Sequence, residues 1–147
     1  MSTISKQNNP FSSPSAKANS DSVASPLFSQ TQIGIASFLG SALAGMTLVA
    51  INHFRLNNIL SGVASLLLGI AIVAVIIPLG MILPIPGFVF SFIQMGVARM
   101  IAKTWFAKQY ESNEAMNVGN GSGWVVAGIT VTWIVIFVAV LIGIQAV

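Results

Sequence analysis

The chain has 147 residues, of which 55% are hydrophobic and only 6% are charged. A soluble domain usually has about 25% charged residues, so this composition excludes an ordinary soluble fold. The net charge of +3 does not indicate a nucleic-acid partner, because the Lys and Arg residues are scattered and form no stripe that could follow phosphates. The chain has no cysteine, which excludes disulfides and thiolate metal sites.

Two regions differ in composition. Residues 1–28 are rich in Ser, Pro and Asn and have no long apolar run. Their hydrophobic surface is too small to offset the entropy lost on ordering, so we predict a disordered tail. Residues 29–147 contain four hydrophobic segments and are predicted to form one all-α integral membrane bundle. We expect its helices at about 30–52, 59–79, 84–106 and 123–147.

The first hydrophobic segment has no charge between Ile33 and Ile51. At 1.5 Å per residue this stretch reaches about 28 Å, close to the thickness of the hydrocarbon core of a bilayer. Ser29 and Gln32 have the spacing of a capping box, which predicts a helix start. Asn57 tolerates the left-handed conformation in which helices often stop. The segment is therefore predicted to be a membrane-spanning helix.

The second and fourth segments fit a membrane-spanning helix better than the third. Leu60 to Ile77 is unbroken and apolar until Pro78, which is expected to end or kink the helix, and 123–147 has no charge at all. The third segment is short and rich in Phe, and it either spans the membrane or is re-entrant. Its one strongly polar side chain, Gln94, is expected to cap a neighbouring backbone or to face another helix.

The orientation depends on this third segment. Four basic residues near helix ends are expected to contact headgroups and to set the topology: Arg55, Arg99, Lys103 and Lys108. With four spans, the positive-inside rule places both termini outside the cytoplasm. With three spans, it places the N-terminus inside. The sequence leaves both arrangements open.

Small residues recur every four positions on the first two helices. Such spacing gives a flat stripe along which helices approach closely. We interpret these stripes as a packing seam between the first two helices, with a homodimer or partner face as the alternative. The residues are Ser37, Gly40, Ser41, Ala44 and Gly45 on the first helix, and Ser61, Ser65 and Gly69 on the second.

Chemistry-bearing groups are scarce. The first, second and fourth segments contain no ionisable group at membrane depth, which argues against ion-coupled transport. The single histidine, His53, has no nearby carboxylate and is expected to be an interfacial residue. We therefore expect no cofactor, no metal and no enzymatic activity.

Several short motifs resemble one family of small bacterial multi-pass inner-membrane proteins that has no assigned activity. The likeness rests on Gln32-Ile33, on the run Phe38 to Gly45 (Phe-Leu-Gly-x-x-Leu-Ala-Gly), and on Asn52 and Asn57. It covers roughly 27–147. The chain departs from the family where Ser41-Ala42 replaces Gly-Pro and Asn57 replaces Gly. The resemblance implies a bacterial inner membrane and about four hydrophobic segments.

These observations predict a non-enzymatic interaction or accessory component of the membrane. Its expected partners are the lipid bilayer and a second copy or another membrane protein, with no nucleic acid. The alternative is a small oligomeric channel or carrier for an uncharged solute. Its water-lined path would contain Ser37, Ser41, Ser61, Ser65, Gln94, or Thr130 and Thr132.

Overall fold

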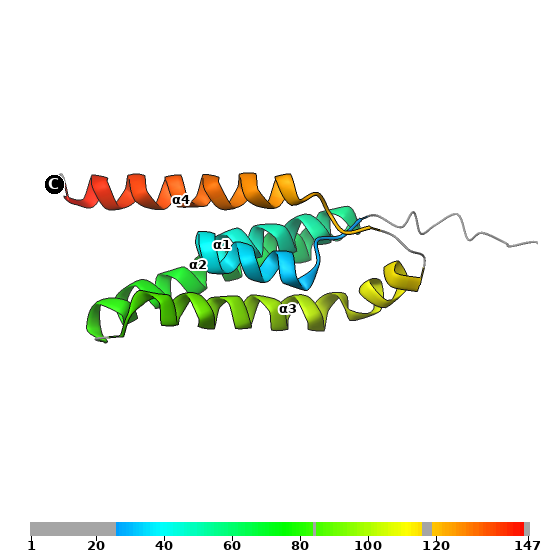
Figure 1. The fold of residues 1–147 in the computed structure, drawn as a ribbon, viewed down its shortest axis with the longest axis horizontal. Helices are drawn as coiled ribbons and strands as arrows, with labels where there is room; N and C mark the ends of the chain where they lie inside the picture. The colour runs from blue at the N-terminus through cyan, green and yellow to red at the C-terminus, as the bar shows by residue number, and fades with distance from the viewer. Residues whose placement is uncertain (1–25, 84, 116–118, 146–147) are drawn as a thin grey trace, which may run out of the picture.

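The computed structural model describes residues 26–83, 85–115 and 119–145, which form helices and no strand. This arrangement confirms the predicted all-helical fold class. Three helices, the first, second and fourth, are long and apolar enough to cross a membrane. The four helices in Figure 1 are α1 (Gln30–Arg55), α2 (Ile59–Ile82), α3 (Gly87–Ala115) and α4 (Gly123–Gln145).

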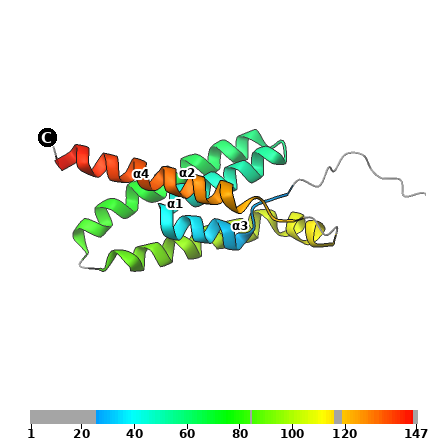
Figure 2. The same cartoon turned by 45° about the horizontal axis from the view of Figure 1, so that its top comes forward.

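The two ends of α1 lie together. The Phe28 N–H donates to Oδ1 of Asn52 at 2.8 Å, and Nδ2 of Asn52 donates to the Phe28 carbonyl at 3.0 Å. A straight helix of this length would separate these residues by more than about 30 Å. Figures 1 and 2 show the first and last parts of α1 side by side, both reaching the same end of the molecule. Thus α1 is a helical hairpin and not one uninterrupted helix.

The reversal of α1 occurs at Ser41, whose φ of 77° and ψ of 169° are non-helical. Two arms, 30–40 and 42–55, pack closely because small residues face one another between them. A Cβ on Gly45 would overlap Oγ of Ser37 and lie 3.1 Å from the Ile33 carbonyl oxygen. The sequence analysis expected an unbroken span here. That expectation is corrected because contacts between the arms override the uniformly apolar helical pattern.

The α1 hairpin is the centre of the bundle. It packs against α2, α3 and α4, whereas α2 and α3 contact each other little. In its most apolar stretch 67% of α1 residues are buried, against 17% in α2 and 11% in α4. Since the arms are only about 16 and 21 Å long, the hairpin reaches about half to two thirds of the way through the roughly 30 Å hydrocarbon thickness.

Helix boundaries follow the sequence in part. The capping box is present, with Ser29 N–H donating to Oε1 of Gln32 and Gln32 N–H to Oγ of Ser29. Asn57 has the expected positive φ, 56°.

Other helix boundaries differ from the prediction. Helix α2 continues through Pro78 to Ile82. The segment expected to be short is the longest helix, α3, with 29 residues. The predicted tail, residues 1–28, includes Leu27 and Phe28, and both side chains are buried in the structure. Residues 1–25 lie outside the described structure.

The molecule has two different ends. One holds residues 26–29, the α1–α2 turn and the loop before α4, and the other holds the α2–α3 turn and the end of α4 (Figures 1 and 2). We name these the basic end and the apolar end. Every charged residue in the described part of the chain lies between the level of the α1 hairpin tip, where Gln94 meets Ala42, and the basic end: Arg55, Arg99, Lys103, Lys108, Glu111 and Glu114.

The α1 hairpin predicts which ends of the helices lie on the same side of the membrane. Single cysteines replacing the exposed residues Thr31 and Asn57 should react with a membrane-impermeant reagent from the same side of the membrane, because α1 returns to the side where it begins. A cysteine at Ile85, in the α2–α3 turn, should react from the opposite side. The chain is free of native cysteine, so labelling is specific. Labelling of Thr31→Cys and Asn57→Cys from opposite sides would show that α1 crosses the bilayer.

Candidate functional site

A side chain from α3 accepts a hydrogen bond from the backbone at the break in α1. Gln94 is 9% exposed, and its Oε1 accepts the Ala42 N–H at 2.5 Å. A helix start leaves backbone N–H groups without helical partners, and hydrocarbon offers none, so such a break is stable only when the protein itself supplies acceptors. Gln94 performs this role, so it caps a backbone group of another helix, in line with the two roles expected for it.

A cavity of about 490 Å³ lies beneath the tip of the hairpin, and we name it the sub-hairpin cavity. It is formed by the hairpin tip and by the parts of α2, α3 and α4 nearer the apolar end. Its apolar walls include Phe38, Ile77, Phe90, Ile134 and Phe137.

Polar groups line one part of the sub-hairpin cavity. They are the side chains of Ser41, Ser91 and Gln94. Because the amide oxygen of Gln94 is used by Ala42, its Nε2 remains as a donor, and within the described part of the chain it donates to no other group. The lining contains no ionisable residue. Such a site suits an uncharged molecule, because burying an unpaired charge at this depth is costly.

Phe28 joins four segments at the basic end. Its backbone bonds to Asn52, and its carbonyl oxygen also accepts from the Tyr110 hydroxyl at 2.9 Å. The Arg55 guanidinium lies 4.7 Å from the centroid of the Phe28 ring. A Cβ on Gly121 would lie 2.5 Å from that ring. The buried Phe28 therefore fixes the start and end of α1, the end of α3 and the loop before α4.

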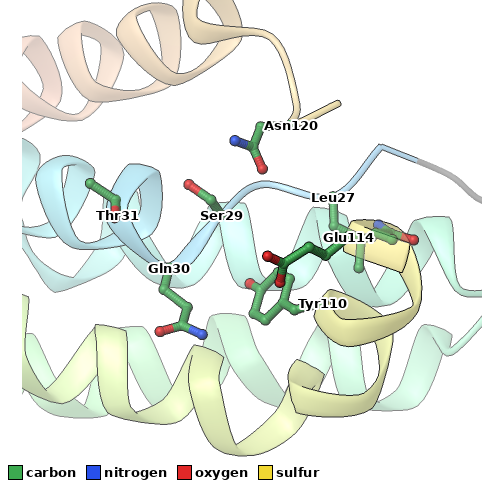
Figure 3. A pocket seen from close by; sticks show the side chains of 8 residues that line it. Leu27, Ser29, Gln30, Thr31, Tyr110, Glu114 and Asn120 are labelled. Atoms are coloured by element: carbon green, nitrogen blue, oxygen red, sulfur yellow. The ribbon is translucent and has the colours of Figure 1, made fainter. Parts of the chain in front are cut away.

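A second cavity, of about 430 Å³, opens beside this junction (Figure 3). The Tyr110 ring and the Glu114 carboxylate lie near each other in it, and Asn120 approaches from the loop before α4. It lies at the basic end, where its polar side chains can be solvated. Nothing in its lining is both buried and unpaired, so we read it as part of the water-facing surface. The lining is Leu27, Ser29, Gln30, Thr31, Tyr110, Asn113, Glu114 and Asn120.

His53 lies close to aromatic residues of α3. Its ring centroid is 5.3 Å from that of Trp105 and 4.7 Å from that of Phe106. With Ser61 and Ala64 of α2, it lines a cavity of about 280 Å³. No group of three His, Cys, Asp or Glu side chains that could hold a metal occurs among the described residues.

The predicted small-residue stripes lie in different places. On α1, Ser37 faces Gly45, and a Cβ on Gly40 would contact both Ala44 and Thr130 of α4. Ser41 forms the break. These residues therefore pack α1 on itself and on α4.

The stripe on α2 packs against the second arm of α1. A Cβ on Gly69 would lie 2.9 Å from Cβ of Met46. Ser65 is fully buried and donates to the Ser61 carbonyl in its own helix, while Ser61 lines the cavity at His53. The structure therefore does not bring the two serine stripes together.

The four basic residues predicted to set the topology occupy separate positions. Arg55 donates to the Pro26 carbonyl at the basic end. The Arg99 side chain lies beside Gly34, where a Cβ would be 2.6 Å from its Cγ. Lys103 and Lys108 are exposed on α3. Sequence reasoning did not identify Phe28, Asn52 and Tyr110 as a joint, although Asn52 is a visible polar interruption at the end of an apolar run.

Comparison of the chain with protein-family models, with curated proteins and with solved structures finds no match.

Replacing Gln94 tests how the break is stabilised. In Gln94→Leu the Ala42 N–H loses its acceptor, so we expect the unfolding free energy to fall by about 1–3 kcal/mol. Titration of the detergent-solubilised protein with SDS would measure this. Thr104→Val is the matched control on α3, because that hydroxyl bonds only to the Met100 carbonyl of its own helix. Equal stability of both variants would show that the Gln94 cap contributes nothing.

Proposed function

We propose that the protein is a non-enzymatic component of a bacterial inner membrane that binds another membrane protein through α4. The observation that carries this proposal is the packing of α4. Among the described helices, α4 contacts α1 alone. Its contacts come mainly from its first half, where Val126 and Thr130 are buried and Trp133 donates to the Thr47 hydroxyl at 3.1 Å.

The rest of α4 is largely uncovered, and within the described chain its Ile134 and Phe137 line the sub-hairpin cavity. Five consecutive apolar residues, at positions 134–138, are each at least 40% exposed, so every side of this stretch is partly exposed. Helices associate in membranes through close van der Waals packing, which small residues allow. Gly128, Thr132 and Val135 lie on one exposed face at helical spacing, and a Cβ on Gly128 would meet no atom within 4 Å. This face can accept another helix.

The basic end is assigned to the cytoplasm under this proposal. The described charges all lie on the basic-end side of the hairpin tip, and the positive-inside rule places Lys and Arg on the cytoplasmic side. With α1 returning to its starting side, the three crossings that we propose are α2, α3 and α4. Of these, α2 and α4 are long and apolar enough by composition to span a membrane, and α3 would cross with its apolar first part, before Arg99. The bacterial inner membrane itself follows from the family resemblance.

Photo-crosslinking in membranes tests the role of α4. A benzoylphenylalanine at Val135, which is 60% exposed, should give a discrete protein adduct. The same residue at Leu67 of α2, which is 61% exposed, should give none. The two positions are matched in exposure, so a difference reports a specific partner.

Two results of this experiment would count against the proposal. One is the absence of a protein adduct at Val135, and the other is the same set of adducts at both positions. Identification of the adduct by mass spectrometry separates a second copy of this chain from a different protein.

A carrier for an uncharged solute is the second candidate function. It is favoured by the broken α1 helix, because discontinuous helices form binding sites near the midplane in many transporters. The break at Ser41 opens onto the sub-hairpin cavity.

Solute flux separates the two functions. If the protein is an interaction component, proteoliposomes should show the same glycerol permeability as protein-free liposomes, measured by stopped-flow light scattering. A permeability that rises with protein content and is abolished by Ser41→Leu would establish the carrier instead. Ser122→Leu, in the exposed loop before α4, serves as the control for insertion and folding.

A further inference from the structure

We infer that the sub-hairpin cavity binds a neutral, lipid-soluble molecule that carries hydrogen-bond acceptor oxygens. This inference goes beyond the proposed partner binding by α4 and does not depend on it. It rests on the size of the cavity, on its polar groups and on the absence of charge in its lining.

The size suits a small ligand. A volume of about 490 Å³ falls in the range typical of small-molecule sites, about 300–1,000 Å³. A helix is about 10 Å across, so this volume holds only about one turn of a helix and matches a small molecule better. The cavity is formed by the tip of α1 and by all three other helices, and its walls are aromatic and aliphatic.

The polar groups indicate what the ligand must offer. Gln94 is nine-tenths buried, and its Nε2 donates to no group in the described part of the chain. The hydroxyls of Ser41 and Ser91 line the same cavity. A donor that meets only hydrocarbon loses its hydrogen bonds, so a bare alkyl chain in the cavity would leave these groups unsatisfied. A ligand with carbonyl or ether oxygens would accept from them.

The lining excludes a charged ligand. It contains no Lys, Arg, His, Asp or Glu, and the nearest described cation along α3, Arg99, packs beside Gly34 on the basic-end side of the hairpin tip. A charge in the cavity would be desolvated without a counter-charge. The ligand is therefore neutral and reaches the site from the lipid phase.

The test measures binding of decylubiquinone, a neutral benzoquinone with a ten-carbon chain, to the full chain in detergent micelles by isothermal titration calorimetry. Decylbenzene, which has the same chain length and no oxygen, is the reference ligand. We expect decylubiquinone to bind at least tenfold more tightly than decylbenzene.

Two sets of variants locate the site. Gly80→Leu fills the cavity, and it is sterically tolerable because the nearest atom to a Cβ there is Cε2 of Phe90 at 3.8 Å. It should weaken decylubiquinone binding at least tenfold. Gly96→Leu is the matched control, since a Cβ on this glycine of α3 meets nothing within 4 Å. It should bind as the wild type does.

The second set removes the hydroxyls without disturbing the fold. The Ser41→Gly and Ser91→Ala double variant is suitable because glycine adopts the positive φ at position 41 readily. It should lose about tenfold in decylubiquinone affinity and leave decylbenzene binding unchanged.

Three outcomes would overturn the inference: equal affinities of the wild type for the two ligands, unchanged binding in Gly80→Leu, or equal losses in the Gly80→Leu and Gly96→Leu variants. Melting temperatures of all variants show whether each one folds. None of these measurements involves a partner protein, so failure here is distinct from failure of α4 crosslinking.

Discussion

The structure depends on satisfying the backbone where α1 reverses inside the bundle. A helix that breaks at membrane depth exposes N–H groups that hydrocarbon cannot bond. Gln94 supplies one acceptor at the break, and the Phe28–Asn52 pair closes the open end of the hairpin. Ser41 stands in a conformation that is costly for a residue with a Cβ, by about 1–3 kcal/mol, so the surrounding contacts must hold it.

This hairpin explains the uneven packing of the molecule. Toward the basic end, α3 and α4 share a buried core with α1, and α2 packs on α1 as well. Because α2, α3 and α4 make few or no contacts with one another in the described part of the chain, little holds them together beyond the tip of the hairpin. The sub-hairpin cavity and the exposed end of α4 both lie beyond the tip of the hairpin, where α1 no longer packs against the other helices. The same hairpin thus creates a stable core and leaves surfaces available for binding.

The sequence predicted local features well. The capping box at Ser29 and the positive φ at Asn57 were predicted because both depend on residues a few positions apart. The isolation of Gln94 in an apolar segment predicted that it would cap a neighbouring backbone or face another helix, and it caps Ala42. The hairpin was not predicted, because an apolar run of this length fits either one crossing or two half-crossings. The candidate cavity was not predicted either, because its lining residues come from all four helices.

By itself, the sequence determined that the chain is helical and suited to a membrane. Its apolar segments are too long and carry too few charged side chains to be shielded from water in a soluble fold. It also determined that charge gathers near certain helix ends. Only the tertiary structure decided that α1 turns back, that the small residues of α1 pack its own two arms, and that Phe28 joins the basic end. These outcomes depend on which helices meet, because close packing of small residues and capping by a distant side chain are properties of pairs of segments that no single segment reveals.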